Sequence, residues 1–287
     1  MKNIAALVSL VFLSVSAIAQ IPTEKTLLWE VSGKDLKSSS YLYGTIHLMC
    51  PDDLKVPEIV KHKFNSTEHL FLEIDMDDPS MMQEMMAGMM MKDNVTIKTL
   101  VGDEKYDHLN KIFASKTGLP LEMMKSTKPM LLMALVYPSL LACKPESWEK
   151  TFQDMAAEKK MTISGLEKVA DQINVFEKIP YKVQADMLMQ MLDNLDSSKA
   201  SFESMLAVYK SKDINKMHEM TTSDKDFGEY EALLLNDRNK NWVPVIANQS
   251  KKMPTFYAVG AGHLGGENGV INLLRKEGFT VKPIMYK

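Results

Sequence analysis

The sequence predicts a protein of the α/β (α+β) class. It should have a central mixed β-sheet, flanking helices and one large helical insertion. Short runs of β-branched and aromatic residues alternate with segments of helical periodicity, which is the pattern of an α/β chain. One long stretch, residues 79–214, is mostly helical in pattern and supplies the insertion. We therefore expect a single domain over residues 20–287, with the sheet as its core.

The first elements are two strands, residues 26–31 and 40–43, on either side of the turn-rich segment SGKDLKSSS. That arrangement predicts a β-hairpin. The segment that begins at Pro51 and continues with two aspartates is expected to open a helix running to Phe64. The later elements are expected at residues 69–76 (strand), 159–168 (strand), 229–249 (helix), 255–260 (strand), 270–276 (helix) and 279–286 (strand).

The first twenty residues, MKNIAALVSLVFLSVSAIAQ, have the layout of a secretory signal peptide. One cation, Lys2, precedes an uncharged apolar stretch, and Ala17 and Ala19 offer a cleavage site. We expect a signal peptide over residues 1–19 and an exported protein, periplasmic or secreted; an uncleaved N-terminal anchor is the alternative. No later stretch approaches the ~20 apolar residues of a membrane-spanning helix, so none is expected in the mature chain.

The charge and the cysteine content indicate which partners and which compartment to expect. The formal net charge is −3, with acids and bases scattered along the chain, whereas a nucleic-acid partner would demand a basic face. The only cysteines, Cys50 and Cys143, form a candidate disulfide in an oxidising compartment, with two buried free thiols as the alternative.

A methionine stripe marks one expected helix. Methionines recur in pairs every four residues, at Met81, Met82, Met85, Met86, Met89 and Met90. This spacing favours a deformable apolar surface, either core or a lid over the substrate, above a soft-metal site for Cu(I).

Two strands end in the same motif. YLYGTIH ends in Gly44-Thr-Ile-His47, and FYAVGAGH ends in Gly260-Ala-Gly-His263, so each aromatic run is followed by G-x-x-H. Side chains just beyond the carboxyl ends of parallel strands line the crevice where α/β proteins bind ligands. We therefore expect the two histidines to meet across one site, although either one alone is better explained as a structural residue.

Carboxylates occupy similar positions. Glu73 stands near the end of the strand at 69–76, and Glu167 follows Gly165 at the end of the strand at 159–168. Neutral imidazoles with one or two carboxylates are a common ligand set for a divalent metal that activates water. Ordinary strand-end histidines and helix-capping glutamates are the alternative.

Other polar motifs carry weaker signals. Arg238, in LNDRN, suits a clamp for a substrate carboxylate or an oxyanion, although on spacing alone a solvated Asp–Arg pair is the better explanation. The segment from Gly260 to Gly265 formally satisfies G-x-G-x-x-G but lacks a following βαβ unit, which argues against dinucleotide binding. The remaining histidines, His62, His69, His108 and His218, are expected at the surface.

Five segments, in order, carry a resemblance to a known family: YLYGTIHLMCPDD, FLEID, ISGLEKVADQINVFEKIP, LNDRN and FYAVGAGHLGGENGVINLLRKEGFTVKPI. Together they resemble the TraB/GumN (PrgY) family over nearly the whole mature chain. The resemblance implies a fold akin to the haem-binding ChaN and erythromycin-esterase-like proteins. It also implies likeness to the animal Tiki proteins, metal-dependent proteases of the Wnt amino terminus, whereas bacterial members are linked to pheromone shutdown and polysaccharide production.

Carried over by position, the resemblance makes His47 and His263 the motif histidines, with Glu73 as their acidic partner. Glu167, Gln172 and Arg238 match further family positions. Asp237 stands where the family often has Glu, a mild departure.

The sequence as a whole predicts an exported metal-dependent hydrolase, a peptidase acting on a peptide or protein. A divalent Mn, Co or Zn ion would be held by His47, His263 and Glu73. Catalytic roles are expected for Glu73, Glu167 and Arg238, and substrate binding for Arg238, Gly262 and Gln172. The alternative is a non-catalytic exported binding protein that sequesters a peptide, haem or metal.

Overall fold

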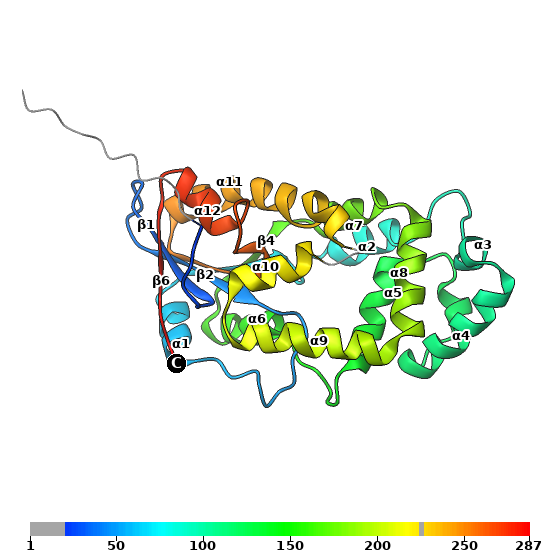
Figure 1. Ribbon diagram of the computed structural model, residues 1–287. Helices are drawn as coiled ribbons and strands as arrows, with labels where there is room; N and C mark the ends of the chain where they lie inside the picture. The colour runs from blue at the N-terminus through cyan, green and yellow to red at the C-terminus, as the bar shows by residue number, and fades with distance from the viewer. Residues whose placement is uncertain (1–20, 224–226) are drawn as a thin grey trace, which may run out of the picture.

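A six-stranded mixed sheet lies at one end of the molecule, as the computed structural model of residues 21–223 and 227–287 shows (Figure 1). Its order is β4-β3-β5-β2-β1-β6. The strands are β1 (Leu28–Ser32), β2 (Ser40–Thr45), β3 (His69–Ile74), β4 (Thr162–Glu167), β5 (Thr255–Gly260) and β6 (Thr280–Pro283). The predicted fold class is therefore confirmed, and β1 and β2 pair as the expected antiparallel hairpin. The predicted signal peptide lies outside the described residues.

Helices cover both faces of the sheet. Figure 1 shows α11 and α12 on one face and α1 and α6 on the other. These helices are α1 (Glu58–Asn65), α6 (Trp148–Lys159), α11 (Asp237–Lys252) and α12 (Val270–Lys276). Between them the core is largely aromatic: the ring of Tyr43 packs against Trp148 and Phe152, and Phe152 against Phe256.

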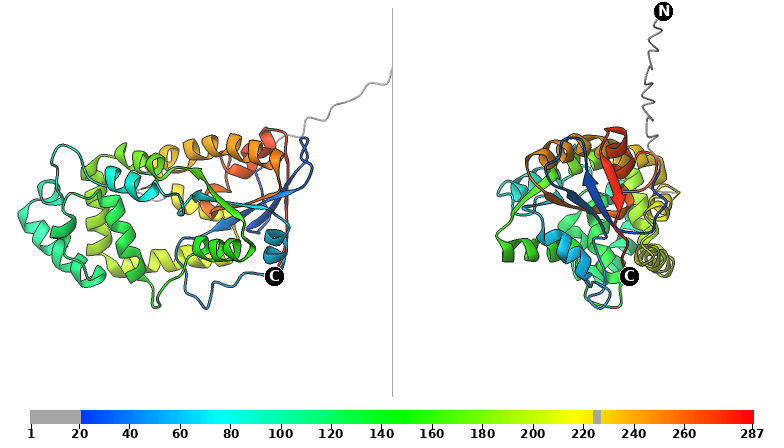
Figure 2. Two further views of the ribbon diagram at one scale, coloured as in Figure 1. Left: turned by 180° about the vertical axis from the view of Figure 1, so that it is seen from behind. Right: turned by 90° about the vertical axis from the view of Figure 1, so that its left-hand side faces the viewer.

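The helical insertion projects beyond one end of the sheet, as the left view in Figure 2 shows. Its helices are α2 (Met81–Gly88), α3 (Ile97–Val101), α4 (Asp103–Thr117), α5 (Pro129–Val136), α7 (Val169–Glu177), α8 (Tyr181–Asp193), α9 (Leu195–Lys210) and α10 (Ile214–Thr222). Lys128 holds this lobe together from a position that is 2 % exposed. Its ammonium donates to the carbonyl oxygens of Gly88 and Met90 and pairs with Glu177 at 2.9 Å. No helix of the described residues is long and apolar enough to cross a membrane.

Two helix predictions were wrong at their boundaries. The helix expected from Pro51 begins only at Glu58, because Pro57 disfavours helical backbone at the residue before it. The helix expected from residue 229 begins at Asp237 and follows a π-turn over Ala232–Asn236. Such turns recur at functional sites, and this one lies directly before Arg238.

The methionine stripe is not part of the core. Helix α2 has no buried residue, and the side chains of Met82 and Met86 are 60 % and 65 % exposed. The helix instead approaches α7 through Gly88, where an added Cβ would lie 2.8 Å from the Ile173 side chain.

Sheet register brings the predicted site residues to one edge. In the parallel pair β2–β5, Thr45 aligns with Gly260, and in the parallel pair β3–β4, Ile74 aligns with Glu167. Because parallel strands end at the same edge of a sheet, all four chain segments that follow or end these strands converge there. That edge faces the helical insertion.

Candidate functional site

The two G-x-x-H turns pack directly against each other. Gly44, the next-to-last residue of β2, lies beside the short 3₁₀ turn Ala261–His263, and an added Cβ at Gly44 would lie 3.1 Å from the Cβ of Ala261. The second motif's glycine, Gly260, donates its N–H to Glu73 at 2.8 Å, and an added Cβ there would lie 3.1 Å from the same carboxylate. Any larger residue at either turn would force its neighbours to shift by a few tenths of an ångström, so glycine is favoured at both.

Arg238 is the centre of a buried polar cluster. It donates to Glu73 at 2.6 Å from Nη2, to Glu167 at 2.6 Å from the same nitrogen and at 3.0 Å from Nε, and to His263 Nε2 at 3.1 Å from Nη1. Nη1 also donates to the carbonyl oxygen of Leu234 in the π-turn. A guanidinium carries five N–H groups, and these five contacts use all of them. In this arrangement Arg238 offers no N–H to a substrate.

Both carboxylates of the cluster are almost inaccessible to solvent; each is 8 % exposed. Burial alone would raise the pKa of Glu73, but the Arg238 guanidinium and the Gly260 N–H hold it well below its usual range. For Glu167, burial raises the pKa against the opposing charge and hydrogen bonds of Arg238. Glu73 is therefore a permanently ionised group, and Glu167 is the carboxylate of the two that protonates more readily.

His263 is held as a neutral imidazole. Its Nδ1 lies 2.6 Å from Asn239 Oδ1, whose amide nitrogen donates to the carbonyl oxygen of Asn268, so the proton belongs on Nδ1. Its ring lies 4.4 Å from the ring of Trp242. Burial, together with the charge of Arg238, lowers the pKa of His263 to about 3. Its Nε2 therefore presents a lone pair, which Arg238 Nη1 now occupies.

His47 is the accessible member of the site. Its side chain is 68 % exposed, and Nδ1 lies 3.1 Å from Oε1 of Glu149, a carboxylate that also accepts from the Thr45 hydroxyl at 2.8 Å. The surrounding protein lowers the pKa of His47, but the hydrogen bond and charge of Glu149 outweigh this and raise it above its ordinary value. The charges of Glu73 and Arg238 also act on His47, the first raising its pKa and the second lowering it.

A covalent link holds Glu149 in reach of His47. A disulfide joins Cys50 to Cys143, and Met49 and Glu146 exchange two backbone hydrogen bonds of 3.0 and 2.9 Å. The segment after His47 is thereby fastened to the start of α6, whose first turn carries Glu149. Sequence reasoning missed Glu149 because no motif marks it; the candidate pairing of the cysteines was the one signal that could have led there.

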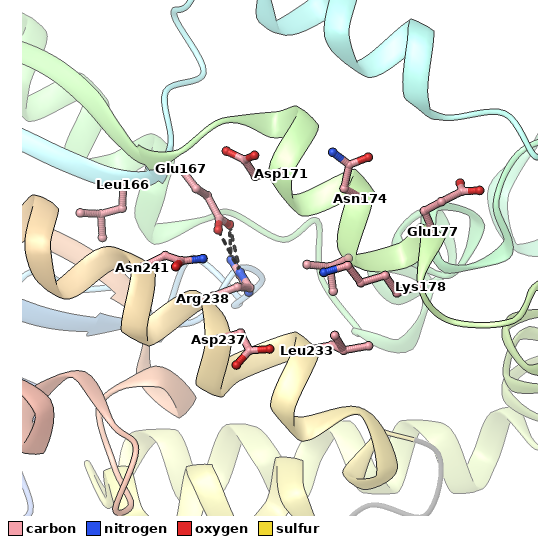
Figure 3. Close-up of a pocket in the computed structure, with 11 residues that line it drawn as sticks. Leu166, Glu167, Asp171, Asn174, Glu177, Lys178, Leu233, Asp237, Arg238 and Asn241 are labelled. Atoms are coloured by element: carbon pink, nitrogen blue, oxygen red, sulfur yellow. Dashed lines mark hydrogen bonds and ion pairs between the residues drawn. The ribbon is translucent and has the colours of Figure 1, made fainter.

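A cavity of about 660 Å³ opens beside the cluster (Figure 3). Glu167 and Arg238 contribute to its wall, while Asp171, Asn174 and Lys178 line the opposite side from α7. Neither motif histidine lines this cavity.

The remaining predicted residues lie at the margins. Gln172 is on α7 but does not line the cavity. Gly262 lies in the second motif, where its carbonyl oxygen is 3.3 Å from Nδ1 of His218. His218 is only 16 % exposed, so the prediction that it is a surface residue was wrong.

The profile of the TraB/PrgY/gumN family matches residues 27–283. The chain belongs to this family. The chain is similar to two proteins that are metalloproteases by name. They are Metalloprotease TIKI2 of Danio rerio, 22 % identical, and the Metalloprotease TIKI homolog of Amphimedon queenslandica, 23 % identical. Each alignment covers 90 % of this chain but only 60 % and 61 % of the respective relative, so the chain spans about three fifths of their length. No solved structure matches significantly.

As arranged, the cluster does not fit a three-ligand metal centre. Across residues 21–223 and 227–287, no three His, Cys, Asp or Glu side chains are placed to hold one ion. The reason is Arg238, whose positive guanidinium lies between Glu73 and His263 Nε2, where a divalent cation would have to bind.

Proposed function

We propose that this protein hydrolyses peptide bonds at the sheet edge where its two G-x-x-H turns meet, with His47 as the group that transfers protons. One observation carries the proposal: His47 is exposed, while its Nδ1 is hydrogen-bonded to the mostly buried carboxylate of Glu149. A carboxylate in this position fixes the imidazole's orientation and leaves Nε2 free to exchange a proton with water or a leaving amine. The family's likeness to the Tiki metalloproteases supports a peptide or protein as the substrate.

The buried cluster has a different task in this proposal. All N–H groups of Arg238 donate to Glu73, Glu167, His263 and Leu234. Arg238 therefore holds the two carboxylates in place and does not bind substrate. Glu73, held ionised, supplies a fixed negative charge that raises the pKa of His47. That charge favours the imidazolium form that arises when His47 accepts a proton.

The Tiki names motivate a second candidate, a metal-dependent peptidase. Metal-ligating histidines almost always bond their second ring nitrogen to an oxygen acceptor, and both motif histidines do so: His47 to Glu149 and His263 to Asn239. His47, His263 and Glu73 would then hold Mn²⁺, Co²⁺ or Zn²⁺, and the ion would supply Lewis acidity. Ion binding would require the Arg238 guanidinium to leave His263.

Export remains part of the proposal. The signal-peptide pattern of residues 1–19 and the disulfide between Cys50 and Cys143 both fit an oxidising compartment outside the cytosol. The N-terminal residue of the protein purified from its native host checks this, because cleavage after Ala19 would leave Gln20 first.

The decisive experiment is hydrolysis of an internally quenched peptide library by the wild type, His47→Ala and Glu149→Gln. General acid–base groups contribute roughly 10²–10⁴-fold, so His47→Ala should lose that much in kcat/KM. Glu149→Gln should also lose activity, by up to roughly 10⁴-fold, as does amide replacement of the carboxylate that orients a catalytic histidine.

The chain offers a matched control in His108, which is 62 % exposed and lies 3.0 Å from Asp193. His108→Ala removes an exposed histidine–carboxylate pair of similar length outside the site, made through Nε2, and should leave kcat/KM unchanged. Equal activity of His47→Ala and wild type would refute the proposal. If no peptide is cleaved by any variant but peptides still bind, the non-catalytic binding protein becomes the better description.

Metal content separates the two candidates. Protein purified with and without a chelator is assayed after addition of Mn²⁺, Co²⁺ or Zn²⁺, and bound metal is measured by elemental analysis. Activity that survives chelation supports the metal-independent mechanism. Stoichiometric metal that disappears in a His47→Ala/His263→Ala variant, together with activity restored only by metal, supports the second candidate.

A further inference from the structure

A second cavity, of about 500 Å³, lies within the helical insertion. Five methionines contribute to its wall: Met133, Met187, Met191, Met205 and Met220. Serine and asparagine side chains of α8 and α9 line its polar side, among them Asn194 and Ser201. A cavity of roughly 150 Å³ already binds benzene, so this one has room for a large side chain. Its volume and its mixture of apolar wall and few polar groups are those of a ligand site.

This methionine pocket shares a wall with the second G-x-x-H turn. Met220 and Thr221 belong to α10 and line the pocket. A Cβ added to Gly262 would lie 3.5 Å from the Thr221 hydroxyl, and one turn earlier on the same helix His218 contacts the Gly262 carbonyl oxygen. The pocket therefore adjoins the residue directly before His263.

We propose that the methionine pocket binds the apolar side chain of a substrate residue next to the scissile bond. The inference rests on the proposed function, because it assumes that a peptide lies along the sheet edge where the two motifs meet. Thioether side chains are flexible and polarizable, so the pocket can adapt to several apolar shapes. We therefore expect acceptance of Leu, Met and Phe together, and rejection of charged side chains, which would lose their hydration without gaining a partner.

The expected preference follows from burial of one apolar side chain. Fully burying Leu or Phe favours the bound peptide by about tenfold to hundredfold over a side chain left in water. Peptides that differ only at the position beside the cleaved bond should show this ratio in kcat/KM, with Leu above Asp.

Two variants test the pocket in opposite ways. Met205→Glu places a charge on the apolar wall and should abolish the preference for Leu over Asp. Ser201→Trp fills the cavity from α9 and should reduce cleavage of Leu and Phe peptides at least tenfold while sparing an Ala peptide. Met86→Glu is the control, because Met86 is 65 % exposed on α2 and does not line the pocket; its preference should equal that of the wild type.

Binding provides a readout that does not need catalysis. Fluorescence anisotropy of labelled Leu and Asp peptides is measured on the wild type and on His47→Ala, with and without Met205→Glu. Tighter binding of the Leu peptide, lost in the Met205→Glu background, supports the pocket even if no peptide is cleaved, which would count against the proposed function alone. Equal affinity for the two peptides overturns the inference. The inference is also overturned if a labelled fatty acid binds more tightly than the Leu peptide and Met205→Glu abolishes that binding.

Discussion

Replacing Arg238 should lower the free energy of unfolding more than replacing either neighbouring carboxylate alone. Arg238 is 11 % exposed, and its partners Glu73 and Glu167 are each 8 % exposed, so Arg238→Met leaves two adjacent negative charges buried without a counter-ion. Breaking a buried ion pair from one side costs about 3–5 kcal/mol. Against a typical total of about 5–15 kcal/mol, a loss of that size is a large fraction of the free energy of unfolding.

The measurement is urea unfolding followed by circular dichroism, with a triple variant as the control. Arg238→Met/Glu73→Gln/Glu167→Gln removes all three charges, so most of the lost free energy should return. A loss below about 1 kcal/mol for Arg238→Met would refute the reasoning, since the cost of an unpaired buried charge should exceed it. A triple variant no more stable than the single one would show that packing, and not charge, is what Arg238 contributes.

Two further predictions concern stability and the fixed position of Glu149. Burial opposes ionisation of Glu177, but Lys128 outweighs it and lowers the pKa of Glu177 to about 2. The ionised form therefore stabilises the fold by on the order of 2 kcal/mol. This contribution should be complete above about pH 4.5 and disappear as the pH falls towards 2. In acid unfolding, Glu177→Gln should accordingly be less stable than wild type at pH 7 and close to it near pH 2; a constant difference across that range would contradict the assignment. Replacing Cys50 and Cys143 with serine should cost about 2–4 kcal/mol in urea unfolding and lower kcat/KM, because both the long loop and the contact of Glu149 with His47 depend on the disulfide; full activity would show that the backbone pairing at Met49 suffices.

Sheet elements were predictable because each one satisfies a local rule. The run that ends in Gly44 is buried along its whole length in β2, and β5 has the same pattern apart from its last residue, Gly260. Alternation of such runs with helices predicted an α/β sheet, and the parallel pairing of β2 with β5 places His47 and His263 at one edge. Glu73 and Glu167 followed by the same argument.

Contacts between distant helices could not be predicted in this way. Glu149 lies on α6, 102 residues after His47, and nothing in its own segment distinguishes it from other acidic residues in the first turn of a helix. His218 was missed for the same reason, since its contact with Gly262 depends on how α10 packs against the sheet edge. Local patterns describe which residues a strand presents, whereas these contacts depend on where the helical insertion folds back.

The role of Arg238 shows why residue type alone is insufficient for assigning chemistry. Two histidines and two carboxylates at strand ends suggested a metal centre, and an arginine in a helix suggested a substrate clamp. The structure brings His263, both carboxylates and the arginine together, so the arginine satisfies the carboxylates that would otherwise attract a cation, and the carboxylates use the donors that would otherwise bind a substrate. What remains accessible is His47 with Glu149 behind it. The chemistry of the site therefore depends on whether Arg238 stays in place, and a variant that keeps the fold while freeing Glu73 and His263 from the guanidinium would show directly whether this donor set takes up a divalent ion.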